Sequence, residues 1–235
     1  MAPGQDNFTI GMLIFPRMTQ LDFTGPFEVL ARIPETTIHV LWKKIEPVVS
    51  DTGLTVLPTT TLSDCPGLDL ICVPGGPGQI ALMDDAEVLT FVRERGEHAR
   101  FVTSVCTGSL VLGAAGLLQG YKATTHWMSL DQLEPFGAIP VAERVVVDRN
   151  RITGGGVTAG IDFGLYITSV ITNEQMAHTI QLSLEYDPRP PFNSGSMKNA
   201  TPETVAAVRA CAATMLSERR AATQRAAQRL ARRAG

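Results

Sequence analysis

The sequence lacks the patterns that mark most metal, cofactor and disulfide proteins. Its four cysteines, at positions 65, 72, 106 and 211, form no C-x-x-C pair, and no His, Asp or Glu pair has metal-ligand spacing on one face. No G-x-G-x-x-G follows a predicted strand, and no G-K-[S/T] follows a glycine-rich loop. We therefore expect no metal, no cofactor and no disulfide framework.

Long apolar runs and a strong net charge are also missing. The run at 10–15 is too short for a signal peptide or a membrane span, and no basic segment precedes it. Together with the unpaired cysteines, this predicts a cytoplasmic protein without a membrane partner. The formal charge of −3 gives no overall reason to expect a nucleic-acid partner.

Charge is nevertheless unevenly distributed along the chain. Residues 201–235 contain seven arginines and two glutamates, a net +5, which leaves −8 for the rest. We interpret this arginine-rich segment as the solvated basic face of a C-terminal helix.

What the sequence does contain is an alternation of short apolar runs and helical patterns. Residues 8–15 form a near-continuous apolar run closed by Pro16, which predicts a central strand buried on both faces. Further strands are predicted at 37–42, 69–73, 101–105, 143–147 and 152–154, with a hairpin around 51–53. Helical patterns occur at 84–98, 128–136, 158–171 and 173–186. The alternation predicts an α/β fold with a doubly wound, mainly parallel sheet and helices on both faces.

The length of 235 residues and a hydrophobic content of 44% suit one large domain. We expect a single α/β domain over 1–235, with its core at about 7–186. A proline-rich connector follows at 187–200, and one helix is expected over 201–235, with Thr201 as N-cap and Pro202 in the first turn.

Cys106 stands where the predicted strand at 101–105 turns into a helix. Small residues follow it, and Gly108 lets backbones approach closely, which is typical of a nucleophile elbow. The usual glycine two positions before the nucleophile is Ser104 here. If the geometry holds, N–H groups at the helix start face the sulfur and favour the thiolate. The alternative is a small buried cysteine that fills a gap in the core.

Two other predicted strands also end in polar or glycine residues. Asp22 follows the first strand, just before a helix for which Thr24 is a candidate N-cap and Pro26 a first-turn residue. Gly75 and Gly76 follow the strand at 69–73 and could expose backbone N–H groups to an anion. Because the carboxyl ends of parallel strands share one edge, these residues could converge with the cysteine. A capping aspartate and a plain tight turn are the structural alternatives.

No histidine is placed to act as the base of a hydrolytic triad. Thr107, not His, follows Cys106, and His126 is better explained as a structural histidine bonded to the backbone. Asp22 is then the available proton carrier, provided that burial raises its pKa.

At this point the residues resemble the PfpI-type cysteine superfamily, which has a flavodoxin-like fold. The resemblance rests on TSVCTGSLVLGAAGLLQG, KATTHW, QLDFTGPFEVL, VPGG and TGGGVTAGID, and within the superfamily it points to the isocyanide hydratases over nearly the whole chain. It implies that water adds to a small-molecule isocyanide, giving the N-formamide through a covalent thioimidate. Cys106 would be the nucleophile, Asp22 the general acid/base and Thr107 a hydroxyl beside the thiolate. The resemblance also implies a homodimer.

The candidate substrate pocket consists of the amides of Gly75, Gly76 and Gly108. Proteolytic, deglycating and glyoxalase-type relatives carry His after the cysteine and Glu at position 22. This chain has Thr107 and Asp22 at these positions, and both residues argue against those activities. Ligand-sensing domains of AraC-type regulators share much of the CTG, AGLL and ATTHW signature. They append a helix-turn-helix domain, whereas 201–235 has room for one helix. Such a sensor domain, or a redox-responsive cysteine protein, is the alternative to the hydratase.

Overall fold

Strand β1 (Phe8–Leu13) is an interior strand of the main sheet in the computed structural model, which describes residues 7–234. Its near-continuous apolar sequence is buried on both faces, because helices cover both sides of the sheet. It pairs in parallel with β2 (Thr36–Trp42) on one side and β6 (Leu70–Val73) on the other. The prediction of a central buried strand is confirmed.

The main sheet has seven strands in the order β10-β11-β7-β6-β1-β2-β5. The other members are β7 (Phe101–Val105), β11 (Arg151–Gly154), β10 (Val145–Asp148) and β5 (Thr60–Thr61). Every neighbouring pair is parallel except β10 with β11, which is antiparallel. The carboxyl ends of β1, β6, β7 and β11 therefore lie side by side at one edge of the sheet.

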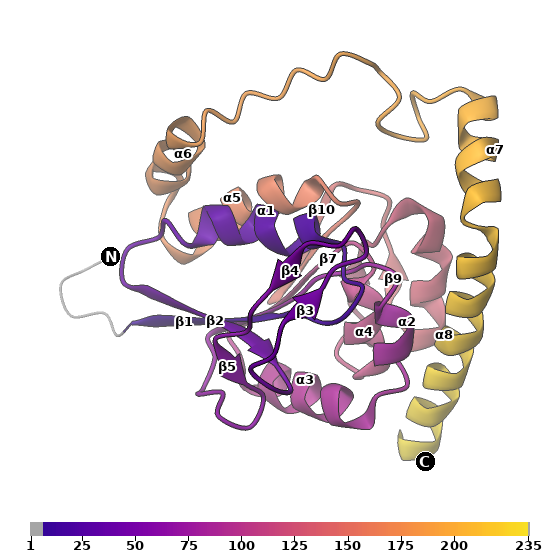
Figure 1. Ribbon diagram of the computed structural model, residues 1–235, viewed down its shortest axis with the longest axis horizontal. Helices are drawn as coiled ribbons and strands as arrows, with labels where there is room; N and C mark the ends of the chain where they lie inside the picture. Colours follow the sequence, from indigo (N-terminus) through magenta and orange to yellow (C-terminus); the bar gives the residue numbers. More distant parts are fainter. Residues whose placement is uncertain (1–6, 235) are drawn as a thin grey trace.

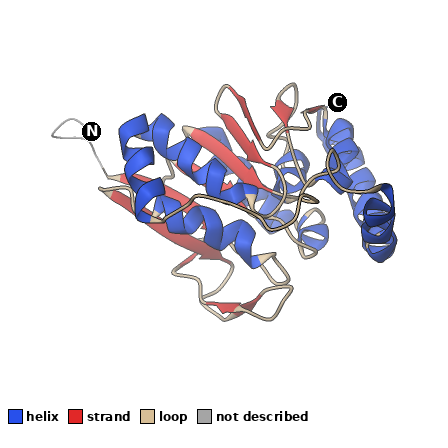
Figure 2. Cartoon of the chain, turned by 90° about the horizontal axis from the view of Figure 1, so that it is seen from above, coloured by secondary structure: helices blue, strands red, loops and turns tan. Residues whose placement is uncertain are grey.

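Helices cover both faces of this sheet, as predicted (Figures 1 and 2). One face carries α1 (Gln20–Leu30) and α5 (Ala159–Ile171), with α6 (Glu174–Ser183) packed against α5. The other face carries α3 (Ala86–His98) and the short α4 (Gly108–Ala114). The result is a three-layer α/β arrangement.

Smaller elements decorate the ends of the strands. An antiparallel ribbon of β3 (Val48–Val49) and β4 (Thr55–Val56) confirms the predicted hairpin. The predicted helix at 128–136 is a 3₁₀ helix, η1 (Trp127–Phe136), next to the parallel pair β8 (Lys122–Ala123) and β9 (Ile139–Pro140). The short α2 (Gln79–Leu82) was not predicted, since four residues carry no helical period.

Helix α1 begins earlier than the sequence indicates. Thr19, not Thr24, is its N-cap residue, and the Thr24 hydroxyl donates to the carbonyl oxygen of Gln20 inside the helix. Pro26 lies in the helix interior, where it packs against α5 so closely that a Cβ on Gly160 would come within 2.9 Å of its ring. Tertiary packing therefore overrides the usual placement of proline in a first turn. Asp22 consequently lies in the first turn of α1.

The C-terminal segment contains two helices rather than one. After the exposed connector, α7 (Pro202–Cys211) has no buried residue, and α8 (Ala213–Ala234) follows a break at Ala212. Helix α8 packs against α2, α4 and η1 along one side of the molecule (Figure 1). No helix within residues 7–234 combines the length and apolarity that crossing a bilayer requires.

The arginines of α8 fit the expectation of a solvated basic face in part, since most are exposed but several have partners on the body of the protein. Arg220 pairs with Asp131, Arg225 pairs with Asp84, and Arg219 is buried with 3% of its surface exposed. The basic residues thus hold the helix to its own chain, because the body carries the complementary negative charge.

A stability test follows from the loop between β6 and α2. A Cβ on Gly78 would lie 2.0 Å from the carbonyl oxygen of Pro16, a backbone atom that has no side-chain freedom to move away. We expect Gly78→Ala to lower the free energy of unfolding by about 1–3 kcal/mol, seen as a fall of roughly 5 °C in Tm. Gly67→Ala is the matched control, because a Cβ there meets nothing within 4 Å. Equal melting temperatures for both variants would contradict this account.

Candidate active site

Cys106 occupies a strained backbone conformation at the end of β7. Its φ of +55° lies in the left-handed region, which costs a residue with a side chain on the order of 1–3 kcal/mol. The strand therefore turns abruptly into α4, as a nucleophile elbow does. The prediction that Cys106 stands at such a turn is confirmed.

Hydrogen bonds from two other parts of the chain hold this strained residue. The Cys106 N–H donates to the carbonyl oxygens of Gly154 (3.0 Å) and Gly155 (2.8 Å) at the end of β11. The Cys106 carbonyl oxygen accepts from the hydroxyls of Thr125 (2.8 Å) and Ser109 (3.3 Å). These contacts explain the TTH and TGGG segments, which no prediction from sequence assigned to the elbow.

Ser104 shows why the elbow tolerates a residue other than glycine two positions before the cysteine. Its side chain is fully buried and exchanges a hydrogen bond with the Ser109 hydroxyl at 2.9 Å. Gly108, by contrast, is required, because a Cβ there would lie 2.0 Å from the carbonyl oxygen of Val73.

The loops that follow β1 and β6 bring Asp22 to the same place. Thr19 N–H donates to Gly75 O (3.0 Å) and Gly78 N–H donates to Arg17 O (3.0 Å), so the two loops are joined by backbone hydrogen bonds. Asp22 Oδ2 then accepts from the Gly75 N–H at 3.0 Å. The predicted convergence of strand ends is thus seen in the structure.

The environment of Asp22 suits a group that exchanges protons near neutral pH. Its side chain is fully buried, and this desolvation raises its pKa from 3.8 to about 7. Hydrogen bonds with the Cys106 thiol and the Gly75 N–H oppose the rise, while the charge of Asp51 adds to it. Asp22 Oδ1 is buried and has no hydrogen-bond partner among residues 7–234.

Cys106 is held as a thiol rather than as the expected thiolate. Burial and the neighbouring Asp22 charge raise the pKa of its thiol well above the ordinary value. The Thr107 N–H and the charge of Arg219 act in the opposite direction. The N–H groups at the start of α4 lower the pKa of the thiol less than burial and Asp22 raise it. In the parent protein, ionisation of the sulfur therefore depends on moving its proton to Asp22.

The predicted amide pocket has a different role in the structure. Gly75 N–H donates to Asp22, and Gly76 N–H donates to the Thr107 hydroxyl oxygen at 3.1 Å, so neither stands free for an anion. Gly75 is required because a Cβ would lie 2.5 Å from Thr107 N and 2.9 Å from Asp22 Oδ2. These glycines position the acid and the hydroxyl beside the cysteine.

His126 is a structural residue at the margin of the site. Its Nδ1 accepts from the Met128 N–H and caps η1, in line with the prediction of a backbone-bonded histidine. Burial, together with the nearby Arg219 charge, lowers its pKa to about 4, so it is neutral at physiological pH. Within residues 7–234, no group of three potential ligands is placed to hold a metal ion.

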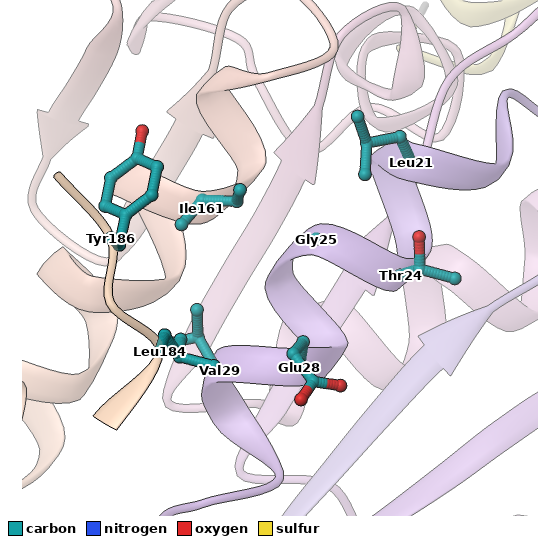
Figure 3. Close-up of a pocket in the computed structure, with 8 residues that line it drawn as sticks. All are labelled: Leu21, Thr24, Gly25, Glu28, Val29, Ile161, Leu184 and Tyr186. Carbon is teal, nitrogen blue, oxygen red and sulfur yellow. The ribbon is translucent and has the colours of Figure 1, made fainter. Parts of the chain in front are cut away.

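A separate pocket of about 340 Å³ lies between α1, α5 and the segment after α6 (Figure 3). Its walls are mainly apolar side chains, with Thr24, Glu28 and Tyr186 as the polar-tipped members. Neither Cys106 nor Asp22 lines it. The candidate catalytic residues Cys106 and Asp22 therefore lie outside this pocket.

Comparison with known proteins agrees with this geometry. The sequence pattern of the DJ-1/PfpI family matches residues 9–169, well over half of the chain. The chain belongs to the DJ-1/PfpI family. A solved DJ-1/PfpI structure at 22% identity, a mutant of a DJ-1 superfamily protein from Salmonella typhimurium, has the same fold, with a TM-score of 0.70 over 77% of this chain and 100% of that one.

More similar relatives exist within the DJ-1/PfpI family. Isonitrile hydratase from Pseudomonas putida is 54% identical over 94% of this chain and 97% of its own length. A THiJ/PfpI protein of solved structure from Pseudomonas syringae is 46% identical, with a TM-score of 0.91 over 94% of this chain and 92% of that one. The HTH-type transcriptional regulator GbdR from Pseudomonas aeruginosa is 30% identical, but it is matched over 68% of this chain and 45% of its own length.

The raised pKa of Asp22 predicts a pH-dependent gain in stability for Asp22→Asn. Below pH 3.8 the carboxyl is neutral in both states; as pH rises to about 7, the unfolded chain releases the proton and the folded chain does not, so folding loses stability. Asparagine avoids this loss. We expect the Tm of the variant to exceed that of the parent by roughly 5 °C or more near pH 8, and by much less near pH 4. Exposed Asp64→Asn is the control, and an equal difference at both pH values for Asp22→Asn would count against a raised pKa.

Proposed function

We propose that the protein hydrates isocyanides, R–N≡C, to N-formamides, using Cys106 as the nucleophile and Asp22 as the proton carrier. The observation that supports this most directly is the buried pair formed by these two side chains, in which the acid has a pKa of about 7 and no histidine participates. The likeness to isonitrile hydratase over nearly the whole chain supports the same reaction.

In the first step the thiol proton moves to Asp22, and the thiolate attacks the terminal carbon of the isocyanide. A C–S bond forms, and protonated Asp22 delivers its proton to the same carbon. The product is a thioimidate, R–N=CH–S, on Cys106, with Asp22 left as a carboxylate. An isocyanide carbon both accepts a nucleophile and takes up a proton, so one acid beside one thiolate is sufficient.

In the second step the Asp22 carboxylate removes a proton from a water molecule that adds to the thioimidate carbon. Asp22 passes this proton to the nitrogen and then accepts the proton of the new hydroxyl as the C–S bond breaks. The products are R–NH–CHO, the Cys106 thiolate and protonated Asp22, which is the state that began the addition. Substrate and water are consumed one to one.

Thr107 supports the sulfur in two ways. Its backbone N–H lowers the pKa of the Cys106 thiol, and its side-chain oxygen is held by the Gly76 N–H. The Thr107 hydroxyl is thereby oriented beside the nucleophile, at the position where His would occur in a hydrolytic relative. We also propose that the protein is a cytoplasmic homodimer, and that it acts on a small molecule and not on nucleic acid.

Two alternatives make different demands on the same site. A redox-sensing cysteine needs an accessible thiol of low pKa, whereas Cys106 is 5% exposed and its pKa is raised. A ligand-sensing role is favoured by the likeness to GbdR, although that match spans less than half of the regulator. It predicts small-molecule binding without turnover.

Direct turnover tests the proposal. With an aryl or cyclohexyl isocyanide, we expect formamide formation to be lost in Cys106→Ala and to fall by roughly 10²-fold or more in Asp22→Asn. Cys106 in Asp22→Asn should still react with iodoacetamide, because the variant also removes the Asp22 charge that raises the pKa of the thiol. Cys72→Ala is a matched control for loss of a buried thiol elsewhere. A parent protein without turnover above the Cys106→Ala background would refute the hydratase.

The pH dependence of turnover follows from the shared proton. Above about pH 7 the pair holds one proton, which can reside on Asp22 and leave the thiolate; below it, both groups are protonated. We expect kcat/KM to fall about tenfold for each unit of pH below 7 and to be level for at least one unit above it. A profile that rises toward acid pH would contradict the assignment of Asp22.

A further inference from the structure

Helix α8 places one charged residue on an otherwise apolar buried face. The buried positions are Arg219, Ala222, Thr223 and Ala226, spaced as successive turns of one helix side. The alanines allow a close approach to the body of the protein. Arg219 enters that interface with 3% of its surface exposed.

Contacts of α8 with α2 and η1 determine where Arg219 lies along η1. The Thr223 hydroxyl donates to Gln132 Oε1 (3.0 Å) on η1 and reaches the Met83 sulfur at the end of α2. One turn earlier on α8, Arg219 Nη1 donates to Ser129 Oγ (3.0 Å), three residues before Gln132. From the Arg219 contact to the Thr223 contact, the chain advances by four residues on α8 and by three on η1. The two helices therefore run in the same direction.

Helix α4 fits the same alignment and places Arg219 near the cysteine. Leu230 of α8 lies beside Gly116, just beyond the end of α4. On η1, Arg219 bonds Ser129, and η1 begins two residues after Thr125, whose hydroxyl donates to the carbonyl oxygen of Cys106. Helix α8 runs beside α4 and α2 (Figure 1). The guanidinium of Arg219 is therefore held at the start of η1, next to the segment that bonds the cysteine turn.

Within residues 7–234, Arg219 is a buried arginine of α8 that has no anionic partner, whereas the unpaired Arg232 and Arg233 of the same helix are exposed to solvent. Arg220, Arg225 and Arg229 each pair with an aspartate, whereas among residues 7–234 Arg219 forms no ion pair and its Nε has no hydrogen-bond partner. A buried cation without a counter-charge is costly, and burial lowers its pKa. Such a group is retained when an anion forms nearby.

Other buried polar side chains on the elements that meet Arg219 also lack hydrogen-bond partners. Five buried side-chain atoms within residues 7–234 have no hydrogen-bond partner: Asp22 Oδ1, Gln79 Nε2, Gln79 Oε1, Gln132 Nε2 and Arg219 Nε. Four of them belong to α2, η1 and α8, the three elements that meet at this level. Unpartnered buried polar atoms are uncommon, so their clustering beside the nucleophile indicates a functional region.

We propose that Arg219 is the counter-charge of the Cys106 thiolate, and that α8 is for this reason a component of the active site. Arg219 is a positioning residue: it touches neither substrate nor the reacting atoms in this structure. Its effect on turnover rests on the hydratase function proposed above, whereas its effect on the sulfur does not.

The charged and titratable groups that face Cys106 are few. Asp22 from α1 raises the pKa of the thiol, and Arg219 from α8 lowers it. His126, at the start of η1, is neutral above a pH of about 4. When the proton passes from sulfur to Asp22, negative charge moves to the sulfur, and Arg219 stabilises the state that attacks the substrate.

The test measures ionisation of Cys106 directly, through the pH dependence of its alkylation by iodoacetamide. Removing the charge in Arg219→Met should raise the thiol pKa by about one unit, which makes alkylation roughly tenfold slower at any pH below that pKa. Arg219→Lys keeps the charge and should restore most of the rate. Arg220→Met, one residue away and exposed, is the matched control and should leave the profile unchanged.

Should Arg219→Met not fold, as judged by circular dichroism, Arg219→Gln supplies the same comparison, because an amide can still donate to Ser129 without carrying charge. A neutral, folded variant whose alkylation profile equals that of the parent overturns the proposal. For turnover we expect kcat to fall about tenfold with little change in KM. If the parent hydrates no isocyanide, the alkylation result still decides the role of Arg219, so the two proposals fail separately.

Discussion

The left-handed backbone of Cys106 is the constraint on which the rest of the site depends. A side chain at φ +55° is retained only where the surroundings hold it, and here the N–H and the carbonyl of the same residue are both bonded across the sheet edge. The partners come from the end of β11 and from the segment before η1. The adjacency of β7 and β11 in the sheet is therefore a condition for holding Cys106 in this turn.

A second constraint is the space shared by one acid and one thiol. Four consecutive strands of the sheet, β1, β6, β7 and β11, deliver Asp22, Gly75, Cys106 and the Gly154 carbonyl to one edge. Glycine at 75 is what allows the carboxyl group and the Thr107 amide to occupy together the space that a side chain at this position would fill. Because the pair is buried, neither group ionises easily, and the single proton they share becomes the means of activation.

The parts of this site that are local in sequence were predictable, and those set by packing were not. The buried strands, the cysteine turn and the convergence of Asp22 with Cys106 follow from apolar runs and from the shared edge of parallel strands. The start of α1 was misplaced because Pro26 packs on Gly160, a contact with no local signal. The thiolate expectation failed because burial outweighs the Thr107 N–H. Arg219 was hidden among seven C-terminal arginines, although its spacing from Ala222 and Ala226 carried the period of a buried face.

The position of α8 bears on how this chain differs from other members of its family. The family pattern ends at residue 169, so the elbow, Asp22 and the β11 glycines lie inside the shared domain while Arg219 lies outside it. The likeness to GbdR covers about two thirds of the chain, whereas the likeness to isonitrile hydratase covers 94%. If a counter-charge from α8 stabilises the thiolate, the reactivity of Cys106 depends in part on a segment that the shared domain does not contain, and the same turn without such an arginine would hold a less readily ionised thiol.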